Sequence, residues 1–483
     1  MNYRMVFYLI GQMLRVEGLL MLLPLLCELI YHEDVLTAFL IPIVLLIAVG
    51  SVLAFKMPQK RDIYAKEGFV VVGLSWILMS AFGALPFVLS GSIPHFVDAF
   101  FETVSGLTTT GASILTDVES LPHAILFWRS FTHWIGGMGV LVFTLAVLPK
   151  SNERSVRLMH VMRAEVPGPV VGKLVSKIKS TARILYGIYM MLTVLETLIL
   201  WIKMPLFDAL CNAFGSAGTG GFGIWNSSIA YYDSAFVDGV ISIFLVLFSL
   251  NFNLFYLLLL RQFKPVFKNS ELRWFLSIVV LATATIMIDT RHLYPTVTSS
   301  FRYSFFQVMS IVSTAGFSTA NFNTWPILSK TILVILMFVG ACVGSTGGGL
   351  KVGRIMLLAK TFLREVRHML HPRSVTVIRT DGKRVEEETI RGTSAYLITY
   401  MFLFTASILL LALLDNFDLI SNFTAVASCI NNIGPGLEMV GPAGNFSLFS
   451  NASKILLSFD MLAGRLELFP VLMIFSPSTW KNN

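Results

Sequence analysis

Four apolar stretches of this chain end in a short polar turn that carries glycine. Each gives about a dozen helical residues, which is too few to cross a bilayer but suits a half-helix that enters and leaves on one side. The bare backbone after such a half-helix can lie at membrane depth only where protein buries it or water reaches it. The four stretches are VDAFFETVSGLTTTGAS (97–113), FDALCNAFGSAGTGGFG (207–223), FRYSFFQVMSIVSTAGFST (301–319) and ISNFTAVASCINNIGPG (420–436). Aligned on the glycine, they end in TTTG (108–111), AGTG (217–220), STAG (313–316) and NNIG (431–434), which makes them copies of one repeat.

Long apolar runs separate these stretches and identify the chain as a polytopic membrane protein. Of its 483 residues, 55% are hydrophobic and only 13% are charged, whereas a soluble protein carries about a quarter charged residues. Apolar runs of about 20 residues, long enough to cross a bilayer, occur at ten places. We therefore predict crossings near 6–30, 36–56, 68–90, 124–148, 182–203, 235–260, 272–290, 329–362, 392–414 and 452–475.

The net charge of +8 is distributed in a way that indicates membrane orientation rather than nucleic-acid binding. Most of the 36 lysines and arginines lie in four connections between predicted crossings, 56–66, 150–183, 261–273 and 351–391. The intervening connections are poor in both residues, and this alternation places the basic connections in the cytoplasm. We expect both termini on that side and no nucleic-acid partner. Contact with anionic lipids is an additional explanation for the basic connections.

Half-helices, glycine turns and crossings together predict an all-α polytopic membrane protein. Its unit is a helix, a half-helix with its turn (a P-loop) and a second helix, and four such units surround a pseudo-fourfold pore. An extra N-terminal helix pair brings the total to about ten transmembrane helices. The predicted units are the N-terminal helix pair at 1–60, pore repeat 1 at 61–150, pore repeat 2 at 151–265, pore repeat 3 with an intramembrane gating loop at 266–370, and pore repeat 4 at 371–483.

A ring of four glycine turns can bind a monovalent cation. Glycine lets the segments approach closely, a ring of backbone carbonyls can replace the hydration shell of the ion, and each half-helix directs its partially negative C-terminal end toward the site. The turns contain no Asp or Glu, which argues against a carboxylate ring. A single turn could equally be a packed structural loop, but four in register favour a pore for a large alkali cation. The predicted ion-binding residues are Thr108, Thr109, Thr110, Gly111, Ala217, Gly218, Thr219, Gly220, Ser313, Thr314, Ala315, Gly316, Asn431, Asn432, Ile433 and Gly434.

Several motifs resemble the Trk/Ktr/HKT superfamily of potassium transporters, and within it the Trk-type membrane subunit, over essentially the whole chain. They are GLTTTGAS (106–113), WIGGMGVLV (134–142), STAGFST (313–319), GSTGGGLKVGRI (344–355), NNIGPG (431–436) and GRLELFP (464–470). The resemblance implies a selectivity filter whose four glycines are Gly111, Gly220, Gly316 and Gly434. In plant relatives, serine at the first position accompanies sodium permeation, so Gly111 favours potassium. The doubled glycine of the second strand (Gly220 and Gly221) leaves looser selectivity, or a sodium-permeable member of the superfamily, as an alternative.

The glycine cluster GSTGGG at 344–349 interrupts the apolar run 329–362. A Walker phosphate loop is excluded because Leu350 separates the last glycine from Lys351, and close packing of small residues is the alternative. So many glycines cannot hold a stable helix, and unwound backbone at that depth lines the water path. The resemblance likewise implies a loop that blocks permeation. The predicted gate consists of Gly344, Ser345, Thr346, Gly347, Gly348, Gly349 and Arg465.

Arg465 lies inside the last predicted crossing, where a charge is costly and faces a cavity or a partner. The carbonyls freed by unwinding of 344–349 are its preferred partners. An acid elsewhere in the chain is the alternative, because Glu467 lies on a different helical face. Lys351 and Arg354 are expected to anchor the cytoplasmic edge.

The resemblance also implies partners and a location. We expect a multi-pass protein of the bacterial cytoplasmic (inner) membrane, a homodimer, with a ring of cytoplasmic nucleotide-binding regulatory subunits docked on the basic face. K⁺ is the transported ion, held by the filter carbonyls. This chain has no nucleotide-binding motif and no expected cofactor, so NAD or ATP/ADP would bind the regulatory partner. The potassium-binding subunit of a P-type ATPase pump complex is the alternative function.

An enzyme is not expected. The eight histidines are dispersed, and His123 and His133 are interpreted as interface or packing residues. The four cysteines lie in apolar segments without metal-ligand spacing and are predicted to be small buried residues. They are Cys27, Cys211, Cys342 and Cys429.

Overall fold

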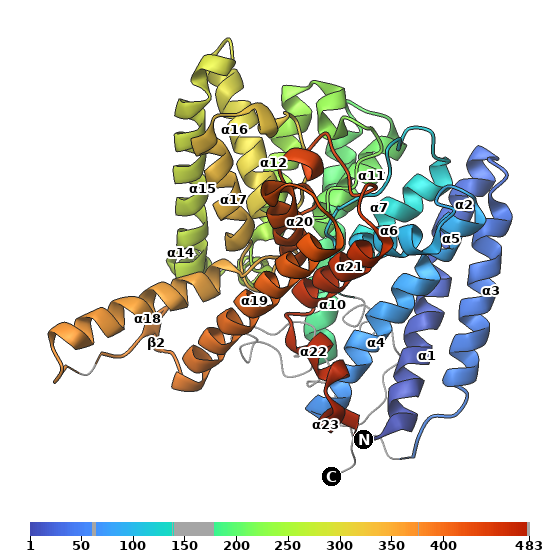
Figure 1. Ribbon diagram of the computed structural model, residues 1–483, viewed down its shortest axis with the longest axis horizontal. Helices are drawn as coiled ribbons and strands as arrows, with labels where there is room; N and C mark the ends of the chain where they lie inside the picture. Colours follow the sequence, from blue (N-terminus) through green and yellow to red (C-terminus); the bar gives the residue numbers. More distant parts are fainter. Residues whose placement is uncertain (60–63, 138, 140–177, 375, 481–483) are drawn as a thin grey trace.

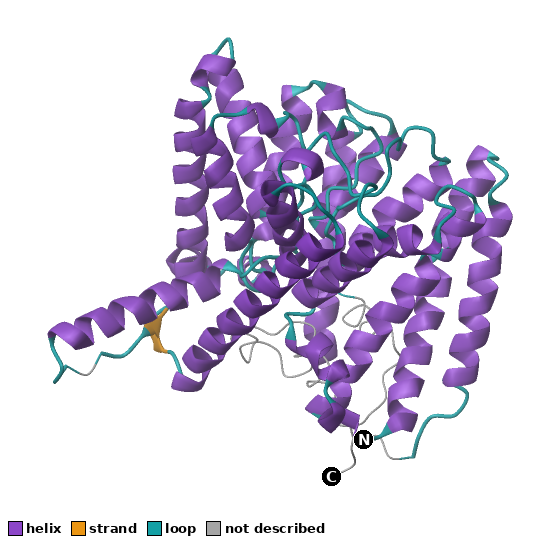
Figure 2. Cartoon of the chain, in the orientation of Figure 1, coloured by secondary structure: helices purple, strands orange, loops and turns teal. Residues whose placement is uncertain are grey.

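The computed structural model describes residues 1–480 except 60–63, 138, 140–177 and 375 (Figure 1). In this part the regular secondary structure is helical apart from one short hairpin, which pairs β1 (Arg379–Thr380) with β2 (Lys383–Arg384) in antiparallel register (Figure 2). Most of the basic connection 150–183 and the second half of the predicted crossing 124–148 lie outside the described residues.

Three helices form a group at the N-terminus, coloured blue in Figure 1. They are α1 (Tyr3–Leu20), α2 (Leu22–Tyr31) and α3 (Leu36–Leu53). Helices α1 and α3 approach closely at two glycines, because a Cβ atom on Gly11 would lie 2.7 Å from the carbonyl oxygen of Gly50. Small residues permit such contacts between membrane helices. The predicted crossing 6–30 is broken at Met21, between α1 and α2.

Four times along the described chain, a long helix leads into a half-helix of 12 to 16 residues and then into a turn. The long helices are α4 (Ala65–Gly83, followed by α5, Leu85–Leu89), α10 (Ile178–Leu200), α15 (Ser270–Asp289) and α19 (Glu387–Leu414). The half-helices are α6 (Phe96–Leu107), α11 (Leu206–Gly218), α16 (Val297–Val312) and α20 (Leu419–Asn431). All four lie within or next to the stretches predicted from the sequence.

The helices that follow the turns are interrupted more often than expected. Helices α12 (Ala235–Ser249) and α13 (Phe252–Leu259) meet at an angle of 91°. A non-helical segment at 340–351 separates α17 (Ile327–Val339) from α18 (Val352–Leu370), and a break at 466–468 separates α21 (Asn451–Arg465) from α22 (Phe469–Phe475). The remaining helices are α7 (His123–Gly137), α14 (Phe263–Lys268) and α23 (Pro477–Trp480). Four short 3₁₀ helices lie in the connections, η1 (Ser228–Tyr232), η2 (Arg291–Leu293), η3 (Phe322–Thr324) and η4 (Glu438–Val440).

Five helices of the described chain are long and apolar enough to cross a membrane, or six if the bent pair α12 and α13 is one span. The count is lower than the ten predicted crossings because four of these are broken and 124–148 is only partly described. Apolar side chains on the outer helices face away from the protein, among them Val44, Leu281 and Leu413. The core lies around the half-helices, where all residues from Cys211 to Gly218 of α11 are buried.

Candidate functional site

Each half-helix ends in the same backbone motif. In α6, the amide of Thr110 donates to the carbonyl of Ser105 at 2.8 Å, and the amide of Thr109 donates to the carbonyl of Gly106 at 3.1 Å. This is a Schellman motif, in which a left-handed residue, usually glycine, ends the helix. Here the left-handed residues are Thr109, Thr219, Thr314 and Asn432. Such a backbone costs a non-glycine residue about 1–3 kcal/mol and is concentrated at functional sites.

A glycine with positive φ follows two residues after each left-handed residue. The four glycines are Gly111 (81°), Gly221 (69°), Gly316 (76°) and Gly434 (102°). In the second turn the sequence alignment placed Gly220 at this position, but the amide of Gly220 instead closes the Schellman motif on Gly215 at 2.9 Å. The structure therefore moves the second turn by one residue, and Ala217 falls within α11. We define the glycine turns as 108–111, 218–221, 313–316 and 431–434.

The four glycine turns contact one another in a closed order. A Cβ atom added to each of the four glycines would collide with the backbone carbonyl of the next turn or lie tightly against it. The pairs of glycine and carbonyl are Gly111 with Gly220, Gly221 with Ala315, Gly316 with Ile433, and Gly434 with Thr110. Each turn thus approaches the next, and the fourth approaches the first. Glycine is required at these positions, because the contact leaves no room for a Cβ atom and the positive φ would strain any other residue.

Side chains of the fourth turn reinforce the closure. Asn432 donates from Nδ2 to the hydroxyl of Thr110 at 3.0 Å and to the carbonyl of Met461 at 2.9 Å. Asn431 accepts a hydrogen bond at Oδ1 from the hydroxyl of Tyr400 at 3.0 Å. The two asparagines that begin the fourth turn are therefore fixed by specific partners.

The segment 340–351, hereafter the intramembrane loop, contains the predicted gate residues and is non-helical. Its backbone pairs with the break between α12 and α13. The amide of Cys342 donates to the carbonyl of Ser249 at 3.0 Å, and the amide of Thr346 donates to the carbonyl of Phe248 at 3.3 Å. In return, the carbonyl of Gly344 accepts from the amide that begins α13 at 3.0 Å. These contacts satisfy backbone groups that a broken helix leaves without partners.

The intramembrane loop also contacts two glycine turns directly. The amide of Gly348 donates to the hydroxyl of Thr314 at 2.6 Å, and the amide of Gly349 donates to the carbonyl of Asn431 at 3.1 Å. The loop therefore lies against the third and fourth turns, at the C-terminal ends of α16 and α20.

Among its contacts with the described residues, Arg465 donates to backbone carbonyls of three residues. They belong to Thr346 at 2.7 Å, Gly136 at 2.5 Å and Gly137 at 2.8 Å. The first lies in the intramembrane loop, among the partners expected for Arg465. The other two carbonyls belong to the last two residues of α7, and these contacts were not expected. One guanidinium therefore joins the loop, the last long helix and the end of α7.

Lys351 and Arg354, expected to anchor the cytoplasmic edge, both have partners within the described structure. Lys351 donates to the carbonyl of Gly347 within the intramembrane loop, and Arg354 is paired with Glu467. The guanidinium carbon of Arg354 also lies 4.2 Å from the centre of the Tyr396 ring. Glu467 can reach Arg354 because the chain breaks at 466–468. There Glu467 has a φ of 56° and no longer lies on the helix that the sequence suggested.

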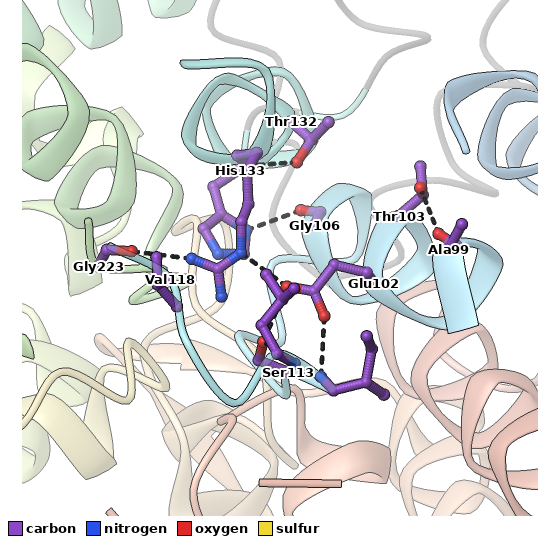
Figure 3. Close-up of polar contacts among 12 residues, drawn as sticks. Ala99, Glu102, Thr103, Gly106, Ser113, Val118, Thr132, His133 and Gly223 are labelled. Atoms are coloured by element: carbon purple, nitrogen blue, oxygen red, sulfur yellow. Dashed lines mark hydrogen bonds and ion pairs between the residues drawn. The ribbon is translucent and has the colours of Figure 1, made fainter. Parts of the chain in front are cut away.

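Three polar residues behind the first two turns were missed as site residues. Arg129 and Glu102 form a buried ion pair at 2.6 Å. His133, interpreted above as packing, has its Nδ1 atom 2.8 Å from the carbonyl of Gly106 in the half-helix (Figure 3). A signal was available, because charges inside apolar membrane segments are costly and usually functional.

The loops that follow the first two turns are joined by hydrogen bonds. Asn226 accepts at Oδ1 from the amide of Val118 at 2.8 Å and donates from Nδ2 to Asp117 at 3.0 Å. The hydrogen bond from Asn226 lowers the pKa of the Asp117 carboxyl, so this exposed group stays ionised at neutral pH. Among the described residues, no group of three or more His, Cys, Asp or Glu side chains could hold a metal ion. All four cysteines are buried, as predicted.

The chain is similar to cation transport proteins along almost its whole length. The TrkH family model, described as a cation transport protein, matches residues 36–482. The Trk system potassium uptake protein TrkH of Salmonella typhimurium is 37% identical over 489 residues, covering 100% of both chains. The Trk system potassium uptake protein TrkG of Escherichia coli K12 is 33% identical, covering 100% of this chain and 99% of its own. The crystal structure of the potassium transporter TrkH from Vibrio parahaemolyticus matches with a TM-score of 0.90 at 32% identity, covering 100% of both chains.

Proposed function

The chain belongs to the TrkH family of cation transport proteins, and we propose that it takes up potassium through a pore formed by its four glycine turns. The family consists of transporters rather than enzymes, and its members named above are potassium uptake proteins of the Trk system. The apolar helices embed this chain in a membrane. Potassium transport through the Trk system is therefore its general activity, and the pore is the part that we propose.

The closed order of the four glycine turns is the observation that carries the proposal. Turns that approach one another in sequence, each through a glycine and a carbonyl, are the arrangement needed for carbonyls to replace the hydration shell of an ion. The filter comprises residues 108–111, 218–221, 313–316 and 431–434. The four pore repeats delimited above, 61–150, 151–265, 266–370 and 371–483, supply one turn each around a pseudo-fourfold axis.

The intramembrane loop is the gate of this pore in our proposal. Its hydrogen bonds to Thr314 and Asn431 support this role, because they place it against two of the four turns. Arg465 holds the loop closed through the carbonyl of Thr346. The loop is non-helical and five of its twelve residues are glycine, so its displacement would open a path without unfolding a helix.

The remaining parts of the system are also proposals. The relatives are named as members of a system, which indicates more than one component. We propose a homodimer in the bacterial inner membrane, with both termini and the basic connections in the cytoplasm. A cytoplasmic regulatory subunit would dock on the basic face and bind NAD or ATP/ADP, because this chain carries no motif for either.

Ion flux in liposomes tests the function directly. The full chain is reconstituted alone, and potassium, sodium and proton gradients are imposed one at a time. We expect potassium flux that exceeds sodium flux in the wild type. Absence of potassium flux in well-folded protein, or equal sodium and potassium flux, would contradict the proposal. Flux that requires a proton or sodium gradient would identify a coupled transporter.

Replacement of Gly111 by Ser tests the assignment of the filter. The added side chain meets the carbonyl of Gly220, so the first and second turns must move apart and sodium permeation should rise relative to potassium. Gly91→Ser is a matched control, because Gly91 also has a positive φ (74°) but no atom within 4 Å of an added Cβ. Equal relative permeabilities of Gly111→Ser and the wild type would argue against the filter.

A further inference from the structure

Arg129 on α7 contacts the chain that leaves the second glycine turn. Its Nη1 atom donates to the carbonyl of Gly223 at 2.8 Å. Its guanidinium carbon lies 3.6 Å from the centre of the Phe222 ring, which is within the range of a cation–π interaction. The guanidinium therefore holds the two residues that follow Gly221 by two different contacts.

Glu102 on α6 contacts the chain that leaves the first glycine turn. Its Oε1 atom accepts from the hydroxyl of Ser113 at 2.9 Å, and its Oε2 atom accepts from the amide of Ile114 at 3.0 Å. Oε1 also accepts from Nε of Arg129 at 2.6 Å. Figure 3 shows Glu102 beside Ser113, with Gly223 on the opposite side of the view.

The pair is enclosed by protein. The Arg129 side chain is 3% exposed and the Glu102 side chain is 0% exposed. Burial of two charges is costly, and such pairs persist where they fix one arrangement of the backbone or where both partners are fully hydrogen-bonded. Here the two charges neutralise each other, and both side chains also bond to the chain after the first and second turns.

Two other buried or partly buried ion pairs join helices to one another. Arg302 on α16 pairs with Asp238 on α12 at 2.6 Å, and Lys454 on α21 pairs with Asp98 on α6 at 2.6 Å. Each joins a half-helix to a neighbouring helix. Arg302 also donates to Asp233, far along the connection that follows the second turn, at 3.4 Å. Among the described contacts, neither pair has a hydrogen bond to the residues directly after a glycine turn. Arg129 is distinguished by its position behind two turns at once.

We propose that Arg129 is a positioning residue of the ion filter, which fixes the separation of the first and second turns, with Glu102 as its counter-charge. The inference rests on the proposed function, because separation of the turns matters for selectivity only if they form the filter. Turns built on conformationally permissive glycines need support from behind to keep one conformation. Without it, the carbonyls of the two turns could adapt to the smaller sodium ion.

Arg129→Lys is the decisive variant. Lysine keeps the charge that Glu102 requires, so the fold is retained, but its compact ammonium cannot reproduce the planar fork that serves Glu102 and Gly223 together. Because the charge-assisted hydrogen bond to Gly223, just after the second turn, is lost, we expect the potassium-to-sodium permeability ratio to fall by about tenfold. Arg302→Lys is the matched control, as the same change in an ion pair away from the turns, and should leave the ratio unchanged.

A neutral double variant separates positioning from folding. Arg129→Gln alone leaves Glu102 buried without its cation and is expected to lower the thermal stability. Glu102→Gln combined with Arg129→Gln removes both charges and should recover much of that stability. The permeability ratio of the double variant should stay low, because the amide introduced in place of the guanidinium is too short to reach both partners.

The measurement is the reversal potential of reconstituted protein under a potassium–sodium gradient, with the melting temperature recorded for each variant. A lower ratio in Arg129→Lys and in the stable double variant, with Arg302→Lys like the wild type, supports the inference. A wild-type ratio in stable Arg129→Lys or in the double variant would overturn it and leave the proposed function intact. A wild type without potassium selectivity would overturn both.

Discussion

Replacement of Arg465 by Ala should open the proposed gate. The side chain donates to the carbonyl of Thr346 in the intramembrane loop at 2.7 Å, and to the carbonyls of Gly136 and Gly137 at the end of α7. Alanine removes these contacts, and of the three hydrogen bonds only the first joins the loop to α21. The free-energy change for opening therefore depends mainly on the hydrogen bond to Thr346.

A hydrogen bond that involves a charged group contributes about 1.5–3 kcal/mol. Because about 1.4 kcal/mol corresponds to a factor of ten, its loss should raise the open population roughly ten- to hundredfold where the closed state dominates. The upper part of this range requires that water does not replace the arginine at Thr346. Loss of the two contacts to α7 adds a local destabilisation that does not favour either state of the loop.

The assay is potassium flux per reconstituted protein, without any regulatory partner, together with the potassium-to-sodium permeability ratio. We expect flux to rise and the ratio to change little, because the three carbonyls that accept from Arg465 lie outside the glycine turns. Arg465→Lys is the matched control, because lysine retains the charge and one donor for Thr346 and should give a smaller rise. The melting temperature shows whether each variant is folded.

Two results would refute this reasoning. Reduced flux in folded Arg465→Ala would mean that the arginine supports the open path rather than the closed one. A collapse of the permeability ratio would mean that the loop is part of the filter. Deletion of the loop is a weaker test than the point substitution, because Gly348 and Gly349 donate to Thr314 and Asn431 and their removal would disturb two turns.

Three further predictions address the register, the orientation and a second contact of the loop region. Gly221→Ser should raise relative sodium permeability in reversal-potential measurements, because its Cβ meets the carbonyl of the third turn; an unchanged ratio would contradict the revised register. A cysteine at position 370 should be labelled only from the cytoplasm and one at position 119 only from outside, and a reversed pattern would contradict the proposed orientation. Arg354→Gln and Glu467→Gln should each lower the melting temperature, and the double variant should show a coupling energy of about 0.5–3 kcal/mol in a double-mutant cycle; additive effects would mean that the pair contributes nothing.

The half-helices and their turns could be predicted because length and composition determine them. An apolar stretch too short to cross must return to the side from which it came, and glycine at its end permits the return. The predicted stretch 420–436, for example, contains nearly all of α20 (Leu419–Asn431) and the fourth turn. Its N-terminus is also readable from the sequence, since Asp418 accepts from the amide of Ser421 as an N-cap at 2.9 Å.

The register of the second turn could not be predicted from sequence alone. Gly220 and Gly221 are adjacent, so alignment on a glycine fits either one. The backbone decides between them, because Thr219 takes the left-handed φ of 56° and Gly221 then occupies the position of Gly111. The requirement for glycine at 221 comes from a tertiary contact, because the carbonyl of Ala315 leaves no room for a side chain there.

The break between α12 and α13 was missed for a related reason. The run 235–260 is apolar throughout most of its length and contains neither proline nor glycine at the bend. Asn251 begins α13 as its N-cap, accepting from the amide of Asn253 at 2.9 Å, which is a weak local signal inside a long apolar run. The bend persists because the intramembrane loop supplies partners for the carbonyls of Phe248 and Ser249.

Arg129 and Glu102 were missed although the rule that identified Arg465 applied to them. Each is a charged residue within an apolar membrane segment, where an ionised group is expected to have a partner and a role. Sequence alone does not pair them, because they lie on different helices and 27 residues apart. Their contacts with Ser113 and Gly223 depend on how the chain continues after each turn, which only the folded structure defines.

The interruptions around the proposed gate depend on one another, and this explains how a closed loop can be stable yet able to open. The carbonyls of Phe248 and Ser249, which end α12, are paired with amides of the intramembrane loop, and Arg465 pairs the loop with the end of α7. If the loop leaves, the carbonyls that end α12 lose partners that they need at membrane depth, and Arg465 loses the carbonyl of Thr346. Water can replace the partners only when the path is hydrated, so displacement of the loop and wetting of the pore should occur together. A loop held by backbone groups of broken helices is therefore suited to gating, because its closed state is satisfied by protein and its open state by the water that accompanies the ion.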